Sequence, residues 1–483
     1  MTGKSVKQQV ITSAIWKFSE RMLGQIVSFV VSIILARILM PDDYGLISLV
    51  FIFTTLCDKL LIAGFATSLI QKKDADDIDF SSVLIFSLIA AAALYSLLYF
   101  CAPLIADFYD HFDRELLISV LRVVGLSLFV MAFSSVQHAY VSKNMLFKLN
   151  FWSALGGTFV SGVVGIAMAY MGYGVWALVA QNLLMTIIDC LILLFIVSWR
   201  PSLRFSLDRL KILFSYGWKI FVASILKMIY NDLRGVVIGK LYTPAQLAYY
   251  NRGQSLPQLV DSNITGTIDS VLFPAYSKLQ NNKLELVGAM RRSVKTSCYV
   301  LMPALALMAA IAYPLVSVLL TDKWLPCVPF MQILCFSFMF SPVETENLQS
   351  IKAIGRSDIV LKLEITKRTV GIVLLVCSVP LGLYAIAWSM LLGNIIAAIL
   401  NASPNRKLIG YSLKHQFQDI LPSLLISLMV FAAAFSFVTL NSTLNTWWQL
   451  IGGIAIGGAI YVGFSIVFKV EAFNYIIHLI QKK

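Results

Sequence analysis

The chain has 483 residues, of which 59% are hydrophobic and 13% are charged, and its mean hydropathy is +0.81. Because soluble domains carry about 25% charged residues, this composition excludes a soluble protein and indicates an integral membrane protein. The formal net charge of +13 does not indicate nucleic-acid binding, since the basic residues gather in loops on one side of the predicted membrane.

Fourteen apolar segments are long enough to cross a bilayer as helices, which takes about 20 residues each. The first is too long for a signal-peptide core and has no small-residue cleavage pattern, so we expect it to be retained. No connection is long enough to form a soluble domain. The fold class predicted is an all-α polytopic membrane protein with spans at 11–38, 45–70, 81–106, 116–141, 152–171, 174–197, 210–239, 245–273, 295–320, 328–351, 360–379, 382–402, 420–440 and 447–468.

The orientation of these spans follows from the distribution of basic residues. With the N-terminus in the cytoplasm, the large majority of the 38 Lys and Arg residues fall on the cytoplasmic side or inside spans. Only Arg37, Arg114, Lys240 and Lys323 fall on the outer side. Short loops rich in Lys and Arg stay in the cytoplasm, so both termini are predicted to be cytoplasmic and the span count to be even.

The two regions 13–45 and 215–248 resemble each other. Each has a Trp-Lys pair near the start of a helix (Trp16-Lys17 and Trp218-Lys219), a cation near its outer end and a proline turn. Chance similarity between hydrophobic segments is the alternative. The repeats lie six spans apart and start on the same side, as in transporters with two parallel halves. The domains predicted are therefore an N-terminal lobe at 1–197, a basic linker at 198–209, a C-terminal lobe at 210–402, and a last part at 403–483 with two spans and an amphipathic tail.

Basic side chains inside the spans are the first candidate site. At 100° per residue, those of the first and seventh spans fall within about 80° on one face of each helix. Charges at bilayer depth are costly and usually face a cavity or a partner, and Arg and Lys suit phosphate groups. Structural pairs such as Glu20–Arg21 and Asp232–Arg234 are the alternative, as is snorkelling near helix ends. The predicted substrate-binding residues are Lys17, Arg21, Arg122, Lys219, Lys227, Arg234 and Arg252.

Acidic residues inside the spans form a second set. They could bind Na⁺ or H⁺ and couple transport to a gradient, or they could only balance the charge of the cations. The candidates are Glu20, Asp58, Asp189, Asp261 and Asp269. No cofactor and no metal is predicted, because the seven cysteines are scattered and the four histidines are too dispersed for a metal or catalytic site.

Two segments carry a family resemblance. The opening pattern from Trp16 through Arg37-Ile-Leu-Met-Pro-Asp-Asp-Tyr-Gly45 and the segment Leu247-Ala-Tyr-Tyr-Asn-Arg-Gly-Gln-Ser-Leu-Pro-Gln-Leu259 resemble Wzx-type polysaccharide flippases. The resemblance covers essentially the whole chain and is nearest to the colanic-acid and teichuronic-acid exporter branch. The segment at 247–259 is its most specific part. These flippases belong to the multidrug/oligosaccharidyl-lipid/polysaccharide exporter superfamily.

The resemblance implies two six-helix lobes around a V-shaped cavity, with two further helices. It implies alternating access that carries an undecaprenyl-pyrophosphate-linked oligosaccharide across a bacterial cytoplasmic membrane, for polysaccharide biosynthesis. The partners implied are that lipid-linked oligosaccharide, membrane lipid, H⁺ or Na⁺ as coupling ion, and polysaccharide polymerases or glycosyltransferases.

Other functions remain as alternatives. A multidrug extruder has the same broad fold, but its mostly cationic substrates suit a basic cavity poorly. A lipid II flippase would perform the same chemistry on another glycan. A glycosyltransferase or polymerase would need an external domain, whereas the outer loops run to only about ten residues, and Asp42-Asp43 after Pro41 is typical of a turn and helix cap. The chain is therefore predicted not to be an enzyme.

Overall fold

The computed structural model describes residues 6–62, 65–202, 204–468 and 470–473. Within these ranges only the backbone is described at 6–15, 17–18, 62, 216–224, 226–227, 267 and 269–271. The described residues form helices and short connections, without a strand. They divide into two compact units, Met1–Ala248 and Tyr249–Lys483.

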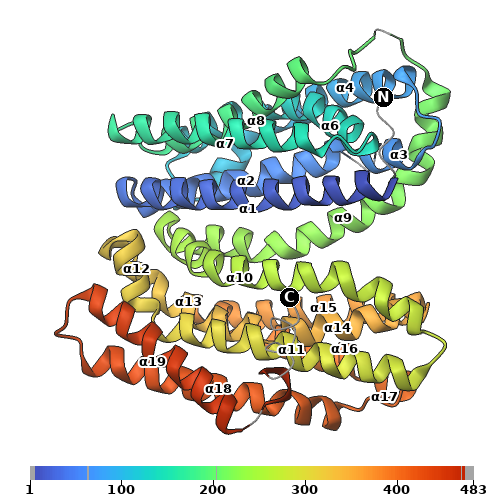
Figure 1. Cartoon of the computed structure of the whole chain (residues 1–483). Helices are drawn as coiled ribbons and strands as arrows, with labels where there is room; N and C mark the ends of the chain where they lie inside the picture. The colour runs from blue at the N-terminus through green and yellow to red at the C-terminus, as the bar shows by residue number, and fades with distance from the viewer. Residues whose placement is uncertain (1–5, 63–64, 203, 469, 474–483) are drawn as a thin grey trace. The chain divides into compact units, whose positions relative to one another are not determined.

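The first unit is built from nine helices in its described part, coloured blue to light green in Figure 1. Helix α7 packs along both α1 and α8, and α9 packs against α2, α3 and α4. The helices are α1 (Val6–Ile38), α2 (Pro41–Ile62), α3 (Phe65–Gln71), α4 (Asp77–Phe108), α5 (Arg114–Gly125), α6 (Ser127–Lys143), α7 (Phe147–Tyr170), α8 (Val175–Ile196) and α9 (Leu207–Leu241).

The second unit follows within α10 (Pro244–Leu279). Helix α18 packs against α11 and α19, and α16 packs against α13, α14 and α15. Its further elements are α11 (Lys283–Ala310), α12 (Ala312–Leu320), η1 (Asp322–Cys327), α13 (Val328–Phe338), α14 (Ser341–Ala353), α15 (Ser357–Ser378), η2 (Val379–Leu381), α16 (Leu383–Ala402), α17 (Asn405–Leu408), α18 (Leu413–Leu440) and α19 (Thr446–Val467).

These helices confirm an all-α, multi-pass membrane protein. Eleven helical segments of the described chain are long and apolar enough to cross a membrane. The seventh, eighth and eleventh predicted spans lie on α9, α10 and α15, which are long helices outside that set of eleven. The count of fourteen spans therefore stays a prediction, as does the division into lobes at 197 and 210. Most of the predicted amphipathic tail at 471–483 lies outside the described residues.

Several predicted single spans are broken into two helices. The span at 116–141 consists of α5 and α6, and the span at 328–351 consists of α13 and α14. Helix α14 has Pro342 in its first turn, where proline lacks an N–H that the helix would not use and presets the backbone angle φ. Hydropathy alone does not reveal such breaks, because each pair of helices still contains an apolar window long enough to cross a membrane.

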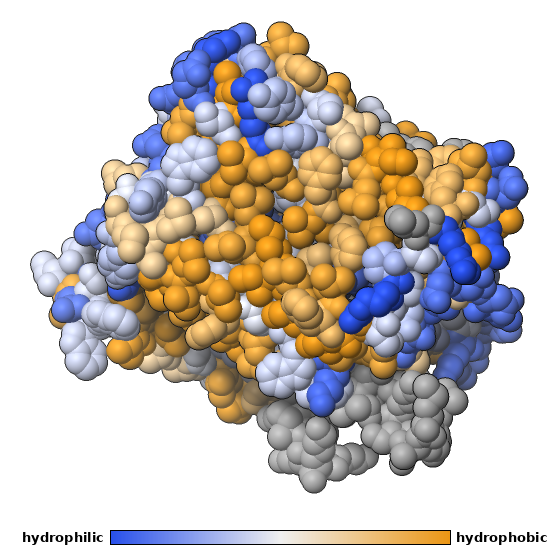
Figure 2. All heavy atoms as spheres, turned by 90° about the horizontal axis from the view of Figure 1, so that it is seen from above, coloured by the Kyte–Doolittle hydropathy of each residue, from blue (hydrophilic) through white to orange (hydrophobic). Residues whose placement is uncertain are grey.

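The surface of one face fits a membrane environment. In Figure 2, hydrophobic residues fill the middle of the face and hydrophilic residues gather toward its sides. Large apolar side chains are exposed on α7 and α8, among them Phe159, Tyr170 and Phe195. In water such a surface would be an association site, whereas lipid tails are as apolar as these side chains.

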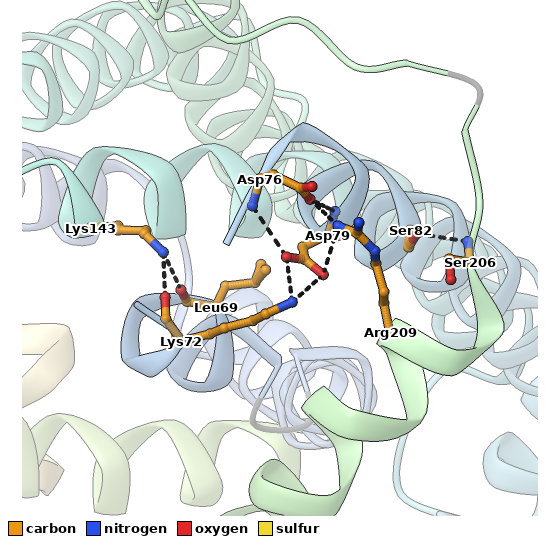
Figure 3. A network of polar contacts seen from close by, with 8 residues as sticks. All are labelled: Leu69, Lys72, Asp76, Asp79, Ser82, Lys143, Ser206 and Arg209. Carbon is orange, nitrogen blue, oxygen red and sulfur yellow. Dashed lines mark hydrogen bonds and ion pairs between the residues drawn. The ribbon is translucent and has the colours of Figure 1, made fainter. Parts of the chain in front are cut away.

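Polar contacts tie three chain segments together at one end of the first unit (Figure 3). Asp79 is fully buried, and its carboxylate accepts hydrogen bonds from Lys72 Nζ at 2.8 and 2.6 Å. Arg209 Nη1 lies 3.7 Å from Asp79 and also pairs with Asp76. Lys143 donates to the backbone carbonyl groups of Leu69 and Lys72. The connections after α3, α6 and α8 therefore lie at one end, as the predicted topology requires.

Removing the Asp79 charge should weaken this network. Asp79→Asn leaves Lys72 and Arg209 without their buried carboxylate and should lower the free energy of unfolding by about 1.5–3 kcal/mol, the value of a hydrogen bond to a charged group. Thermal unfolding of the detergent-solubilised protein measures the effect. The matched control is Asp77→Asn, since Asp77 is exposed in the same helical turn. Equal unfolding temperatures for the two variants would contradict the prediction.

Other connections meet at the opposite ends of these helices. Lys240 Nζ on α9 donates to Asp110 at 2.6 Å. The Ala245 backbone N–H donates to Asp42 Oδ1 at 3.2 Å, so an acidic residue at the start of α2 caps the start of α10. The proline turns of the two predicted repeats therefore contact each other, at Pro41–Asp42 and at Pro244–Ala245.

Gly45 allows this close contact between the two turns. A Cβ atom at Gly45 would lie 1.9 Å from the Pro244 carbonyl oxygen. Real Cβ atoms do not approach backbone atoms so closely, so any other residue at this position would push the two turns apart. Glycine is the residue that permits such backbone approach.

The segment at 247–259 packs against η1 and α13 in the second unit. The Tyr250 and Phe330 rings meet edge to face, with centroids 5.9 Å apart, and a Cβ atom at Gly253 would lie 2.9 Å from the Cys327 carbonyl oxygen. The part of the sequence with the most specific family resemblance is thus a close-packed helix contact.

Candidate substrate and coupling sites

The predicted basic residues are described to different extents. The side chains of Lys17, Lys219 and Lys227 lie outside the described residues, as does that of Asp269. Arg21 is exposed on α1. The remaining three, Arg122, Arg234 and Arg252, are partly buried on α5, α9 and α10.

Arg122 lies against an aromatic ring. Its guanidinium carbon is 3.9 Å from the centroid of the Tyr99 ring on α4, within the range of a cation–π interaction. Its Nε atom is buried and has no hydrogen-bond partner in the described part of the chain. Because buried polar groups are almost always hydrogen-bonded, this donor is available to a ligand.

Arg234 is in a similar state. Its Nε atom is also buried without a hydrogen-bond partner among the described residues. Asp232 and Arg234, which sequence spacing offered as a structural pair, form no ion pair in the described chain. A partly buried cation with an unused donor is what an anionic ligand requires.

Arg252 has an aromatic neighbour in the second unit. Its guanidinium carbon lies 5.2 Å from the centroid of the Trp324 ring, and the Tyr249 ring meets the same indole edge to face at 6.1 Å. Trp324 itself is fully buried. This stacking gives Arg252 a packing role in the second unit.

Arg252→Gln should therefore reduce stability. A cation–π contact contributes about 0.5–2 kcal/mol, so the free energy of unfolding should fall by about 1 kcal/mol. Thermal unfolding of the solubilised protein gives the measurement, with Arg406→Gln as the control, because Arg406 is exposed on α17. An unchanged unfolding temperature for Arg252→Gln would show that the stacking contributes nothing.

The predicted acidic residues have different surroundings. Asp58 on α2 has one buried carboxylate oxygen with no hydrogen-bond partner in the described chain. Asp261 on α10 accepts a hydrogen bond from the Ser341 hydroxyl in the second unit. Asp189 on α8 has a basic partner, His138 of α6.

The contacts of His138 form the most complete polar cluster around a predicted acidic residue. Its Nε2 atom lies 2.8 Å from Asp189 Oδ2, and its Nδ1 atom lies 3.1 Å from Asn150 Oδ1 on α7. The Ser134 hydroxyl donates to the same Asp189 oxygen at 3.3 Å. Glu20 on α1 is near enough to act electrostatically on the imidazole. Four helices thus contribute to this cluster.

His138 is the residue that sequence reasoning missed. The four histidines looked too dispersed to act together, and no spacing rule links α6 to α8. The available signal was the location of His138 inside a predicted span, because an ionisable residue within a membrane is a functional candidate in its own right. No group of three His, Cys, Asp or Glu side chains arranged to hold a metal ion occurs among the described residues.

The comparison with protein families decides the relationship. The family model described as "Polysaccharide biosynthesis protein" matches residues 34–329, which is more than half of the chain. The chain belongs to this family. The match includes α2 to α9, with Arg122, His138, Asp189 and Arg234, and continues into α13.

Individual relatives cover most of the chain at low identity. The teichuronic acid biosynthesis protein TuaB of Bacillus subtilis is 22% identical, with 95% of each chain covered. The succinoglycan biosynthesis transport protein ExoT of Rhizobium meliloti is 23% identical, over 90% of this chain and 88% of its own. A solved structure of the lipid II flippase MurJ, in an inward closed conformation, matches with a TM-score of 0.71 at 16% identity, covering 95% of this chain and 98% of that one. That structural match supports the fold of this family member.

Proposed function

We propose that this protein is a flippase that carries undecaprenyl-pyrophosphate-linked oligosaccharide units across the bacterial cytoplasmic membrane for cell-surface polysaccharide biosynthesis. The observation that carries the proposal is the pair of partly buried guanidinium groups, Arg122 and Arg234, with unused Nε donors. In a multi-pass membrane protein, such groups suit the pyrophosphate of a lipid-linked sugar.

The family and its relatives support this proposal. The family is described by polysaccharide biosynthesis, and ExoT is named as a transport protein for succinoglycan biosynthesis. MurJ, whose fold this chain shares, is a flippase for lipid II. None of these names describes an enzyme that makes or breaks a glycosidic bond, which agrees with the predicted transport role.

The proposed mechanism is alternating access through a cationic central cavity. The pyrophosphate would contact Arg122 and Arg234, together with Lys17, Arg21, Lys219 and Lys227 of the two predicted basic faces. A guanidinium can bind two phosphate oxygens at once, whereas an ammonium acts as a point charge. The basic loops at 72–73 and 198–209 would face the cytoplasm, which places both termini there. Polysaccharide polymerases or glycosyltransferases are the proposed functional partners.

Ligand binding distinguishes this proposal from drug export. The full-length protein in nanodiscs is titrated with an undecaprenyl-pyrophosphate oligosaccharide, with the same oligosaccharide on undecaprenol, and with a lipophilic cationic drug. We expect the pyrophosphate compound to bind at least tenfold more tightly than the neutral one. Tight binding of the cationic drug, with no preference for the pyrophosphate, would contradict the proposal and favour a multidrug extruder.

A further inference from the structure

The cluster around His138 bears on which ion is coupled to transport. We infer that His138 and Asp189 form a proton-binding site in the first unit, so that the transport cycle is coupled to protons rather than to Na⁺. This inference rests on the proposed transport function and deepens it. The sequence analysis left the choice between H⁺ and Na⁺ open, and His138 was not among its candidate residues.

Both ring nitrogens of His138 face acceptors. Nε2 faces the Asp189 carboxylate at 2.8 Å, and Nδ1 faces the Asn150 side-chain oxygen at 3.1 Å. A neutral imidazole has one N–H donor, whereas the imidazolium has two. This arrangement therefore satisfies both contacts only when His138 carries the second proton.

The same residues can accommodate the other protonation state. Loss of one proton leaves a neutral imidazole with one donor and one acceptor nitrogen. Rotation of the Asn150 amide by half a turn would then place its NH₂ group toward Nδ1, while Nε2–H continues to donate to Asp189. One proton is bound or released at the imidazole, and the carboxylate of Asp189 stays charged in both states.

The Asp189 carboxylate stays charged, but its partner differs between these two states. When His138 is protonated, the carboxylate has a cationic partner at 2.8 Å. When His138 is neutral, the carboxylate has no cationic partner and keeps only the hydrogen bonds at Oδ2. Its other oxygen, Oδ1, is buried without a hydrogen-bond partner in the described chain. An uncompensated charge in a membrane span is costly. Proton release therefore favours any rearrangement of α6 and α8 that gives Asp189 more water or another cation.

The pair is not sealed inside the protein. The His138 side chain is 38% exposed and that of Asp189 is 15% exposed. The groups facing the imidazole are Asp189 from α8, Glu20 from α1 and the neutral Asn150 from α7. Lys148, also on α7, has its Nζ 5.7 Å from the centroid of the Trp16 ring. Among the side chains that the structure describes, both charged groups that face His138 are thus acidic, which favours proton binding.

Sodium fits the cluster less well. Hard cations take several oxygen ligands. Asp189 Oδ2 is already bonded to the imidazole and to Ser134, which leaves Oδ1 as the one oxygen of this carboxylate without a hydrogen-bond partner in the described chain. An imidazole suits protons and transition metals, and the described residues provide no three-residue metal group.

Carboxylates in the loops would not make transport respond to pH near neutrality. The Arg209 guanidinium lowers the pKa of Asp76, Lys240 lowers that of Asp110, and Arg356 lowers that of Asp358 to about 2. A lowered pKa means that each pair stabilises the protein above the ordinary Asp value of 3.8 and loses this effect only as the pH falls further. Histidine is the side chain whose ordinary titration lies between pH 5 and 8.

Transport in proteoliposomes tests the inference. Crossing of an undecaprenyl-pyrophosphate oligosaccharide is followed with a pH gradient, a Na⁺ gradient or no gradient. We expect the pH gradient, and not the Na⁺ gradient, to accelerate crossing by the wild type. The control is His415→Gln, at the exposed start of α18 where His415 bonds Ser412, and it should respond like the wild type. With His138→Gln or Asp189→Asn, the oligosaccharide should cross at the rate measured without a gradient. Acceleration of the wild type by Na⁺ alone, or of His138→Gln by the pH gradient, would overturn the inference and leave the flippase intact.

A second readout does not depend on transport. Nitrogen-15 NMR of labelled histidine in the full-length protein follows His138, assigned by its loss in His138→Gln. We expect the His138 signal to titrate and its titration to change in Asp189→Asn. A His138 signal that does not change with pH, or whose titration is the same in Asp189→Asn, would refute the proton site. If the wild type moves no oligosaccharide at all, the proposed function fails, and this titration alone decides the inference.

Discussion

Arg234→Ala should lower the initial rate of undecaprenyl-pyrophosphate oligosaccharide crossing by about ten- to a hundredfold, with normal membrane insertion and abundance. A hydrogen bond to a charged group contributes about 1.5–3 kcal/mol, and each 1.4 kcal/mol is a factor of ten. The Nε donor of Arg234 is buried and has no hydrogen-bond partner among the described residues, so its removal takes away ligand contacts without breaking a described ion pair. Arg122→Ala should act in the same way and also lose the contact with Tyr99.

Arg114→Ala is the matched control. Arg114 is an exposed arginine at the start of α5 and is paired with Asp107 and Glu115. Its removal should leave crossing within twofold of the wild type, because exposed ion pairs contribute about 0–1 kcal/mol. Lys227→Ala extends the test to a basic residue whose side chain lies outside the described residues. Full activity of the Arg122, Lys227 and Arg234 variants would contradict the cationic cavity while leaving the fold intact.

Gly45→Ala should have the largest effect on stability. The added Cβ would lie 1.9 Å from the carbonyl oxygen and 2.3 Å from the carbonyl carbon of Pro244. These are backbone atoms, so no side chain can rotate away, and the start of α2 must separate from the start of α10. Overpacking typically costs about 1–3 kcal/mol, and we expect this substitution to lie at the upper end of that range.

The control for Gly45 is Gly288→Ala in α11. A Cβ at Gly288 would have no neighbour within 4 Å, and alanine is favoured over glycine inside a helix by about 1 kcal/mol. Thermal unfolding of solubilised protein should therefore show a lower midpoint for Gly45→Ala and an unchanged or higher one for Gly288→Ala. If Gly45→Ala unfolded at the same temperature as the wild type, the two turns could not be in the close contact described.

The fold class could be predicted from the sequence because its causes are local. Long apolar runs require helices in a membrane, where every backbone polar group must be bonded within the chain. The repeat at 13–45 and 215–248 also predicted two similar proline turns. Their mutual contact could not be predicted, since it depends on Gly45 meeting Pro244 across some two hundred positions. The break between α5 and α6 was equally hidden, because hydropathy is continuous across it.

The candidate sites divide in the same way. The apolar spans placed Arg122 and Arg234 at membrane depth, and the structure describes both with a buried Nε donor that has no hydrogen-bond partner among the described residues. Periodicity could not distinguish Arg252, which lies over Trp324, because an aromatic partner on another element leaves no mark in the helix's own spacing. His138 was set aside for a related reason. Its partners Asn150 and Asp189 lie on other helices, and only packing brings them within hydrogen-bonding distance.

The central claim is that this protein moves a pyrophosphate-linked oligosaccharide across a bilayer, and a leaflet assay tests it most directly. Proteoliposomes containing the wild type are compared with empty liposomes, using an undecaprenyl-pyrophosphate oligosaccharide that an external reagent can modify only in the outer leaflet. We predict that the protected fraction becomes accessible with the protein and stays protected without it. A protected fraction that persists with folded protein, under every imposed H⁺ or Na⁺ gradient, would contradict the claim.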